Sequence, residues 1–191
     1  MPCCREMLPM IGRHEAVTRS YMIPGMMWPQ ELCWLYDSFS PSRMHAEIGA
    51  FCGKSLYASS VGMQPGSRVI AVEPTVTAFD TPGAAWTRDV LDATISEIEK
   101  REVHVTLVAK LSIDACREFT GTEFDSVFID GSHHYADVCC DIQCWKPLVR
   151  SGGIIAGHDY WPRDAGVMDA VNELVPGFQV VPGTRIWWAT L

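Results

Sequence analysis

The sequence predicts an α/β fold, with a mainly parallel, doubly wound sheet whose two faces are covered by helices. Strand-like and helix-like segments alternate from Met44 to the C-terminus, as parallel strands with helical crossovers require. The interiors of the expected strands are continuously apolar, as at 69–72 and 127–129, which is typical of strands buried on both faces. A chain of 191 residues suits one domain of this kind.

The N-terminal part divides into an arm and the start of the main domain. Residues 1–28 contain many methionines and prolines and show no sustained period, so we expect an irregular arm or a short helix packed on the main domain, 29–191. A helix follows Pro29, because Leu32, Leu35 and Phe39 recur at helical spacing and proline suits a first turn.

The remaining elements alternate along the chain. We expect strands at 44–51, 68–74, 103–110, 124–131 and 152–159, and helices at 54–63, 89–100, 135–149 and 165–174. A terminal hairpin with Pro-Gly at its turn, formed by 178–181 and 185–191, brings the number of strands to seven.

The helix expected at 135–149 has one apolar face. Val138, Ile142 and Trp145 recur at helical spacing and form its core stripe, whereas Asp137 and Asp141 are expected to face outward.

Composition and charge exclude several classes of protein. The chain has 15 basic and 23 acidic residues and a net charge of −8, without a run of lysine or arginine. Binding to the phosphates of DNA or RNA needs the opposite charge, so no nucleic-acid partner is expected. Charges and prolines interrupt every apolar run before the ~18 residues of a membrane span, and the N-terminal segment lacks the apolar core of a signal peptide. We therefore expect a cytoplasmic protein without a membrane partner.

The eight cysteines favour the same location. Cys3–Cys4 and Cys139–Cys140 are adjacent pairs that could bridge only with strain, and no CxxC motif indicates a zinc site. Cys140 and Cys144 lie four apart on an expected helix, so a shared metal is an alternative. We interpret the cysteines as small buried side chains in a reducing compartment.

A glycine turn, "EIGAFCGKS", follows the first strand, at the end of a parallel sheet where ligands bind. Gly49 and Gly53 let the backbone turn tightly and approach a ligand. A phosphate-binding loop would need glycine at Ile48, and a dinucleotide motif would need a small residue at Phe51. These departures favour a nucleoside ligand without a phosphate bridge over the two phosphate-binding motifs, and a plain strand–helix turn is the alternative.

Acidic residues end three of the strands. Glu73 ends the second strand and follows Gly49 by roughly 20–25 residues, where a carboxylate holds a ribose diol. Asp130 ends the fourth strand, and His158 and Asp159 end the fifth. Neighbouring strands would bring these three groups together to bind a divalent cation or to act as acid and base, although aspartates at strand ends also cap helices.

Two histidines, His133 and His134, follow Asp130 closely. Because they are adjacent, only one of them can point into the cleft between the strand ends.

Four segments carry a resemblance to a known family: "AEIGAFCGKSL", "RVIAVEP", "FDSVFIDGSHHYADVCCDIQCWKPLVRSGGIIAGHDY" and "GVMDAVNEL". From about residue 30 to 191 the chain resembles class I S-adenosylmethionine-dependent methyltransferases. It is most similar to the bacterial group that includes small-molecule sugar and natural-product O-methyltransferases. The resemblance implies a Rossmann-like sheet of seven strands with an antiparallel last strand.

The same resemblance implies a role for each site residue. Glu47, Gly49 and Gly53 would face the methionine part of the cofactor, Glu73 would hold the ribose, and Ser112 would lie near the adenine. Asp130 would lie beside the sulfonium and the acceptor. Metal-dependent relatives bind magnesium at the positions of Asp130, His158 and Asp159, so Mg²⁺ or Mn²⁺ is a candidate cofactor. Without a metal, His133 or His134 would be the general base.

These observations lead to the function that we expect. The chain would transfer a methyl group from S-adenosylmethionine to a small molecule, at a hydroxyl oxygen, with Asp130, His133, His134 and Asp159 as candidate catalytic residues. Two alternatives are an NAD-linked oxidoreductase, which Phe51 disfavours, and a non-catalytic protein that binds S-adenosylmethionine. The acceptor pocket would come from the arm, from strand-end loops or from a second subunit in a homodimer.

Overall fold

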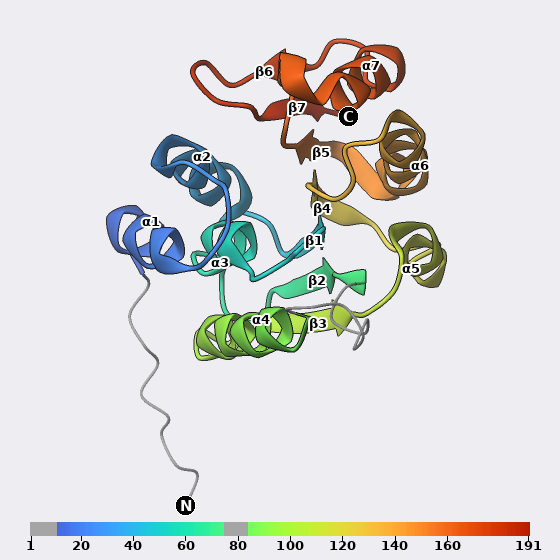
Figure 1. Ribbon diagram of the computed structural model, residues 1–191. Coiled ribbons are helices and arrows are strands. Elements are labelled where there is room, and N and C mark those ends of the chain that lie inside the picture. Colours follow the sequence, from blue (N-terminus) through green and yellow to red (C-terminus); the bar gives the residue numbers. More distant parts are fainter. Residues whose placement is uncertain (1–10, 75–83) are drawn as a thin grey trace, which may run out of the picture.

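The computed structural model describes residues 11–74 and 84–191 and confirms the predicted fold class. The described residues form a seven-stranded sheet with the order β3-β2-β1-β4-β5-β7-β6 (Figure 1). Strands β1 to β5 pair in parallel, whereas β7 is antiparallel to both β5 and β6. The strands are β1 Met44–Ile48, β2 Arg68–Val72, β3 His104–Val108, β4 Phe124–Ile129, β5 Val149–Gly157, β6 Gln179–Val180 and β7 Trp187–Thr190.

Helices cover both faces of this sheet. They are α1 Arg13–Met22, α2 Pro29–Phe39, α3 Lys54–Ser60, α4 Ala84–Glu99, α5 Ser112–Glu118, α6 Tyr135–Trp145 and α7 Ala165–Leu174. Figure 1 shows α1 to α4 on one side of the strands and α5 and α6 on the other. Each face has its own core: Leu35 and Phe39 pack with Phe128 on the first, and Ile142 and Trp145 with Val127 on the second. None of the described helices is long and apolar enough to cross a membrane.

The strand register brings the predicted site residues to one edge. The Asp130 backbone N–H donates to the carbonyl oxygen of Ile48 at 2.8 Å, and that of His158 donates to Ile129 at 3.0 Å. The ends of β1, β4 and β5 are thereby aligned, and the residues that follow them face a common space.

Several element boundaries differ from the prediction. Helix α5 was not expected, because only Ala115 and Cys116 of its seven residues are buried and no apolar stripe reveals it. Helix α4 begins at Ala84 rather than at residue 89. Helix α6 ends at Trp145 and continues as a 3₁₀ turn, Lys146–Leu148, since Pro147 has no N–H for a helical bond.

The expectation that Asp141 faces outward is wrong. Asp141 is 7% exposed and forms a hydrogen bond with the Ser112 hydroxyl, which in turn accepts the indole N–H of Trp145 at 2.8 Å. Burial raises the pKa of Asp141 to about 6. The helical period alone could not reveal this contact, because it comes from α5, a neighbouring element.

The N-terminal segment packs on the main domain through α1. The Ser20 hydroxyl donates to the backbone carbonyl of Lys54 at 2.6 Å, and the Tyr36 hydroxyl donates to that of Ile11 at 2.6 Å. Helix α1 thus lies against α2 and α3. The first ten residues of the expected arm lie outside the described residues.

Candidate active site

A cavity of about 340 Å³ lies beyond the carboxyl ends of β1, β4 and β5. Its wall comes from the segment 24–27, from the glycine turn and α3, from the loops after β4 and β5, and from Arg185. The N-terminal segment and the C-terminal hairpin therefore both contribute to a space that the sheet positions.

The glycine turn packs closely against the loop after β4. Gly49 has a φ of +88°, and a Cβ atom there would lie 2.1 Å from the carbonyl oxygen of Asp130. Gly53 has a φ of +86°, and a Cβ atom there would lie 2.7 Å from Thr94. Both positions therefore require glycine for conformation and for space.

Glu73 lies just beyond the end of β2 and contacts the turn. Its Oε2 accepts the backbone N–H of Phe51 at 2.7 Å, and the residue is only 5% exposed. The carboxylate thus connects the end of β2 to the turn after β1, close to the cavity wall that Phe51 forms.

Glu47 is fully buried within β1. Its carboxylate accepts the hydroxyls of Ser55 at 2.8 Å and Ser59 at 3.2 Å, both from α3. Glu47 and Gly53 are not among the residues that line the cavity, so their contacts hold the turn and α3 in place.

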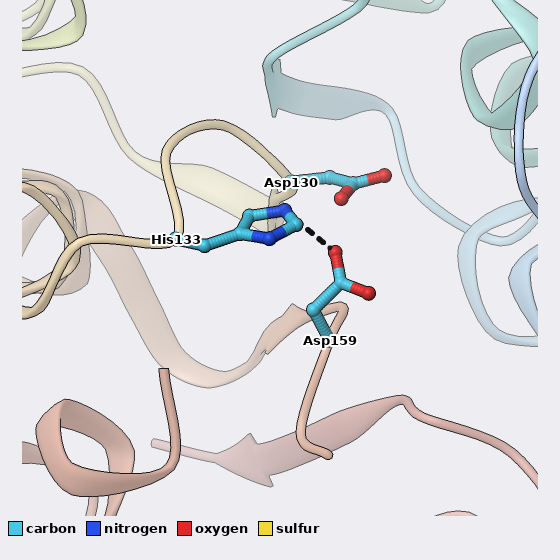
Figure 2. Close-up of side chains that lie close together, drawn as sticks. All are labelled: Asp130, His133 and Asp159. Carbon is cyan, nitrogen blue, oxygen red and sulfur yellow. Dashed lines mark ion pairs between the residues drawn. The ribbon is translucent and has the colours of Figure 1, made fainter. Parts of the chain in front are cut away.

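Asp130, His133 and Asp159 form one cluster at the cavity (Figure 2). His133 Nε2 lies 2.9 Å from Asp159 Oδ2, and its Nδ1 lies 3.0 Å from Asp164 Oδ1. One candidate ligand atom from each of the three residues lies within 4.8 Å of the others. Asp159 has a positive φ of +57°, a strained conformation for aspartate and one that is concentrated at functional sites.

His158 lies beside this cluster and is 5% exposed. Its Nε2 is 3.1 Å from Glu31 Oε1, and its Nδ1 is 3.3 Å from Asp159 and 3.7 Å from Asp130. The structure therefore brings Asp130, His158 and Asp159 together, as the sequence predicts. It places the imidazole of His133, rather than that of His158, in the group with metal-ligand spacing.

The charges of the cluster shift its pKa values in opposite directions. Burial raises the pKa of Asp130 to about 7, although the neighbouring His158 opposes the shift. Burial opposes the charge of His158, yet its carboxylate partners Asp159 and Glu31 raise its pKa to about 10. Burial also disfavours the charge of Asp159, but His158 holds the pKa of this carboxyl below its ordinary value. The site thus combines an imidazolium, a carboxylate and a carboxyl group that titrates near neutrality.

The other predicted site residues lie outside this cluster. His134 is exposed and precedes α6 as its N-cap residue, and Ser112 binds Trp145 and Asp141 at the start of α5. Neither of them lines the cavity.

Sequence reasoning missed several residues that shape the site. Glu31 accepts the backbone N–H groups of Trp28 at 2.8 Å and Arg185 at 3.0 Å, and Arg185 lies between the rings of Trp28 and Trp161. A glutamate three positions after a helix N-cap is a capping signal, so Glu31 was detectable as a cap. Its second role, as a partner of His158, depends on packing.

A seven-stranded sheet of this order, with a cavity at the strand ends bounded by a glycine turn and by acidic residues, is the Rossmann-like fold of class I methyltransferases. A family model described as a methyltransferase domain matches residues 46–160, and the chain belongs to that family. The match includes all the predicted site residues, from Glu47 to Asp159.

Solved structures show the same fold. An O-methyltransferase from Bacillus cereus in complex with SAH is 18% identical, with a TM-score of 0.64 over 94% of this chain and 90% of that one. The O-methyltransferase TomG from Streptomyces achromogenes, in complex with SAM, is 15% identical, with a TM-score of 0.64 over 93% and 89%. A SAM-dependent O-methyltransferase from Thermotoga maritima is 12% identical, with a TM-score of 0.65 over 94% and 71%. No curated protein matches the sequence.

Proposed function

We propose that this methyltransferase acts on a hydroxyl oxygen of a small-molecule acceptor that enters the cavity beside Asp130. The observation that carries the proposal is the cluster of Asp130, His133 and Asp159 next to the glycine turn. Such a cluster can position a hydroxyl and accept its proton, which transfer to oxygen requires and transfer to a neutral amine or thioether does not. The O-methyltransferases among the structural neighbours support the same reaction.

S-adenosylmethionine, when bound, supplies a methyl group on a positively charged sulfur, ready for in-line displacement. In our assignment Glu73 binds the ribose, and Gly49 allows the backbone to approach the cofactor. Ser112 lies toward the adenine end, beyond β3. Glu47 and Gly53 act through the turn that they hold.

Methylation of a hydroxyl requires a base that accepts the hydroxyl proton, and we assign this role to Asp130. The pKa of about 7 lets this carboxyl accept a proton near neutral pH. His133 contacts the carboxylates of Asp159 and Asp164 through its two ring nitrogens, and we assign it a positioning role. His134, outside the cavity, receives no role in this assignment.

The same cluster suits a divalent ion, and in a metal-bound enzyme Asp130 would be a ligand instead of the free base described above. Two carboxylates and one imidazole, with candidate ligand atoms within 4.8 Å, fit Mg²⁺ or Mn²⁺, and we propose Asp130, His133 and Asp159 as its ligands. A bound ion would orient the acceptor hydroxyl and lower its pKa.

Calorimetry with S-adenosylhomocysteine, NAD and ATP tests the proposal, followed by turnover on a panel of hydroxylated acceptors. We expect S-adenosylhomocysteine to bind and NAD and ATP not to bind. Binding of NAD alone would indicate the oxidoreductase alternative. Binding of S-adenosylhomocysteine without turnover on any acceptor would indicate a non-catalytic protein.

A further inference from the structure

Lys54 is a buried cation in the wall of the cavity, and no ion pair joins it to a carboxylate among the described residues. It begins α3, is 8% exposed and lines the cavity. Its ammonium donates one hydrogen bond, to the backbone carbonyl of Tyr21 at 3.2 Å, and lies 4.9 Å from the centre of the Tyr21 ring. By contrast, Lys100 and Lys110 are exposed and each pairs with a glutamate.

Burial of an uncompensated charge is costly, because the ammonium loses water without gaining an anion. Burial lowers the pKa of Lys54, and no acidic neighbour raises it. One carbonyl oxygen satisfies one of the three ammonium protons. An anionic ligand in the cavity would supply the missing charge.

Lys54 lies at the part of the cavity wall that the N-terminal segment forms. Its side chain packs against Gly25, where an added Cβ atom would lie 3.2 Å from the Lys54 Cβ, so the segment 24–27 and α1 border the ammonium. Asp130 and Asp159, which follow β4 and β5, line the same cavity. The wall of the cavity therefore carries both acidic groups and a buried cation.

We propose that Lys54 binds the carboxylate at the amino-acid end of S-adenosylmethionine, which rests on the function proposed above. The cofactor carries a positive sulfonium and, several bonds away, an amino-acid carboxylate. The acidic cluster suits the sulfonium and the lysine suits the carboxylate. Lys54 is a cofactor-binding residue in this assignment and takes no part in proton transfer.

Two ligands that differ in this carboxylate provide the test. S-adenosylmethionine and decarboxylated S-adenosylmethionine share the adenosine, the sulfonium and the amine. Calorimetry measures both affinities for the wild-type protein, for Lys54→Met, which keeps much of the apolar stem, and for Lys54→Arg, which keeps the charge. Lys100→Met is the matched control, because Lys100 is exposed on the loop after α4.

We expect the wild-type protein and Lys100→Met to bind S-adenosylmethionine about 10- to 100-fold more tightly than its decarboxylated form, the range of a hydrogen bond to a charged group. In Lys54→Met this preference should fall to within about threefold, through loss of affinity for S-adenosylmethionine alone. Lys54→Arg should keep most of it. Lys54→Gln replaces Lys54→Met if circular dichroism shows that the latter does not fold.

Three results would overturn the assignment. An unchanged preference in the neutral variant would mean that Lys54 does not contact the carboxylate, and an equal loss for both ligands would mean a merely structural role. A wild-type protein that binds S-adenosylmethionine without any preference would leave no carboxylate contact to assign. If the wild-type protein bound neither ligand, the proposed function itself would fail, and this outcome is distinct from the other three.

Discussion

Glu31 Oε1 lies 3.1 Å from His158 Nε2, although Glu31 belongs to the second helix and His158 to the end of the fifth strand. Both side chains are almost fully buried, with 1% and 4% exposed. Glu31 also accepts the backbone N–H groups of Trp28 and Arg185, so one carboxylate joins the N-terminal segment, the C-terminal hairpin and the site.

Glu31→Gln should destabilise the fold by about 2–4 kcal/mol, because it leaves the buried His158 imidazolium with less negative charge around it. Chemical denaturation at pH 7 measures the free energy of unfolding. Asp37→Asn on the same helix is the control. It removes an exposed pair with Arg13 and should change stability by less than about 1 kcal/mol. Equal effects of the two variants would refute the role of Glu31.

Glu73 has two predicted functions that substitution can separate. Glu73→Gln keeps an oxygen that can accept the Phe51 N–H but removes the charge, whereas Glu73→Ala removes both. Both variants should weaken the binding of S-adenosylhomocysteine by about 1.5–3 kcal/mol, the range of a hydrogen bond to a charged group. Only Glu73→Ala should also lower the thermal midpoint of the ligand-free protein, because the glycine turn loses its contact. Unaltered affinity in both variants would place the ribose elsewhere.

The proposed metal site includes His133 as a ligand but not His158, and substitution of each histidine tests this assignment. Titration of the ligand-free protein with Mn²⁺, followed by electron paramagnetic resonance, should show binding to the wild-type protein. Asp159→Asn and His133→Gln should weaken it by about tenfold or more, because each removes a ligand. His158→Gln should not weaken it, and Asp169→Asn on the exposed side of α7 is the control. Loss of binding in His158→Gln with retention in His133→Gln would restore the ligand set predicted from the sequence.

Asp141 makes stability depend on pH. Its pKa of about 6 in the folded protein exceeds the ordinary value near 4, so the folded state holds this proton more tightly than the unfolded state. This contribution to stability is complete below about pH 4 and is lost as the pH rises through about 6.

Asp141→Asn removes that dependence. It should be more stable than the wild-type protein by about 1–3 kcal/mol at pH 8 and should show no such advantage at pH 4. Urea denaturation at both pH values measures this, with the exposed Asp92→Asn as the control. If the wild-type protein were more stable than Asp141→Asn at pH 8, the ionised Asp141 carboxylate would not be the destabilising buried charge that we infer.

The sequence by itself determined the fold class and most elements. The spacing of apolar residues and the apolar interiors of strands are local properties, so α7 lies at the predicted 165–174 and six of the seven described strands lie within the expected segments. The exception is β5, which begins at Val149 rather than at residue 152. The sequence also predicted that Asp130, His158 and Asp159 lie close together, because residues that follow neighbouring parallel strands are aligned by the strand register.

Only the tertiary structure decided which side chains face one another. His133 and His134 are equivalent in the sequence, and the loop after β4 turns His133 toward Asp159. Asp141 is buried because α5 covers it, and α5 has too few buried residues to be recognised. Lys54 and Glu31 resemble surface charges in the sequence, but α1 contacts the Lys54 ammonium and the C-terminal hairpin contacts the Glu31 carboxylate, and both residues are buried. The spacing of apolar residues along a short segment predicts whether it forms a helix or a strand. Burial and charge pairing instead depend on contacts between segments that are far apart in the chain.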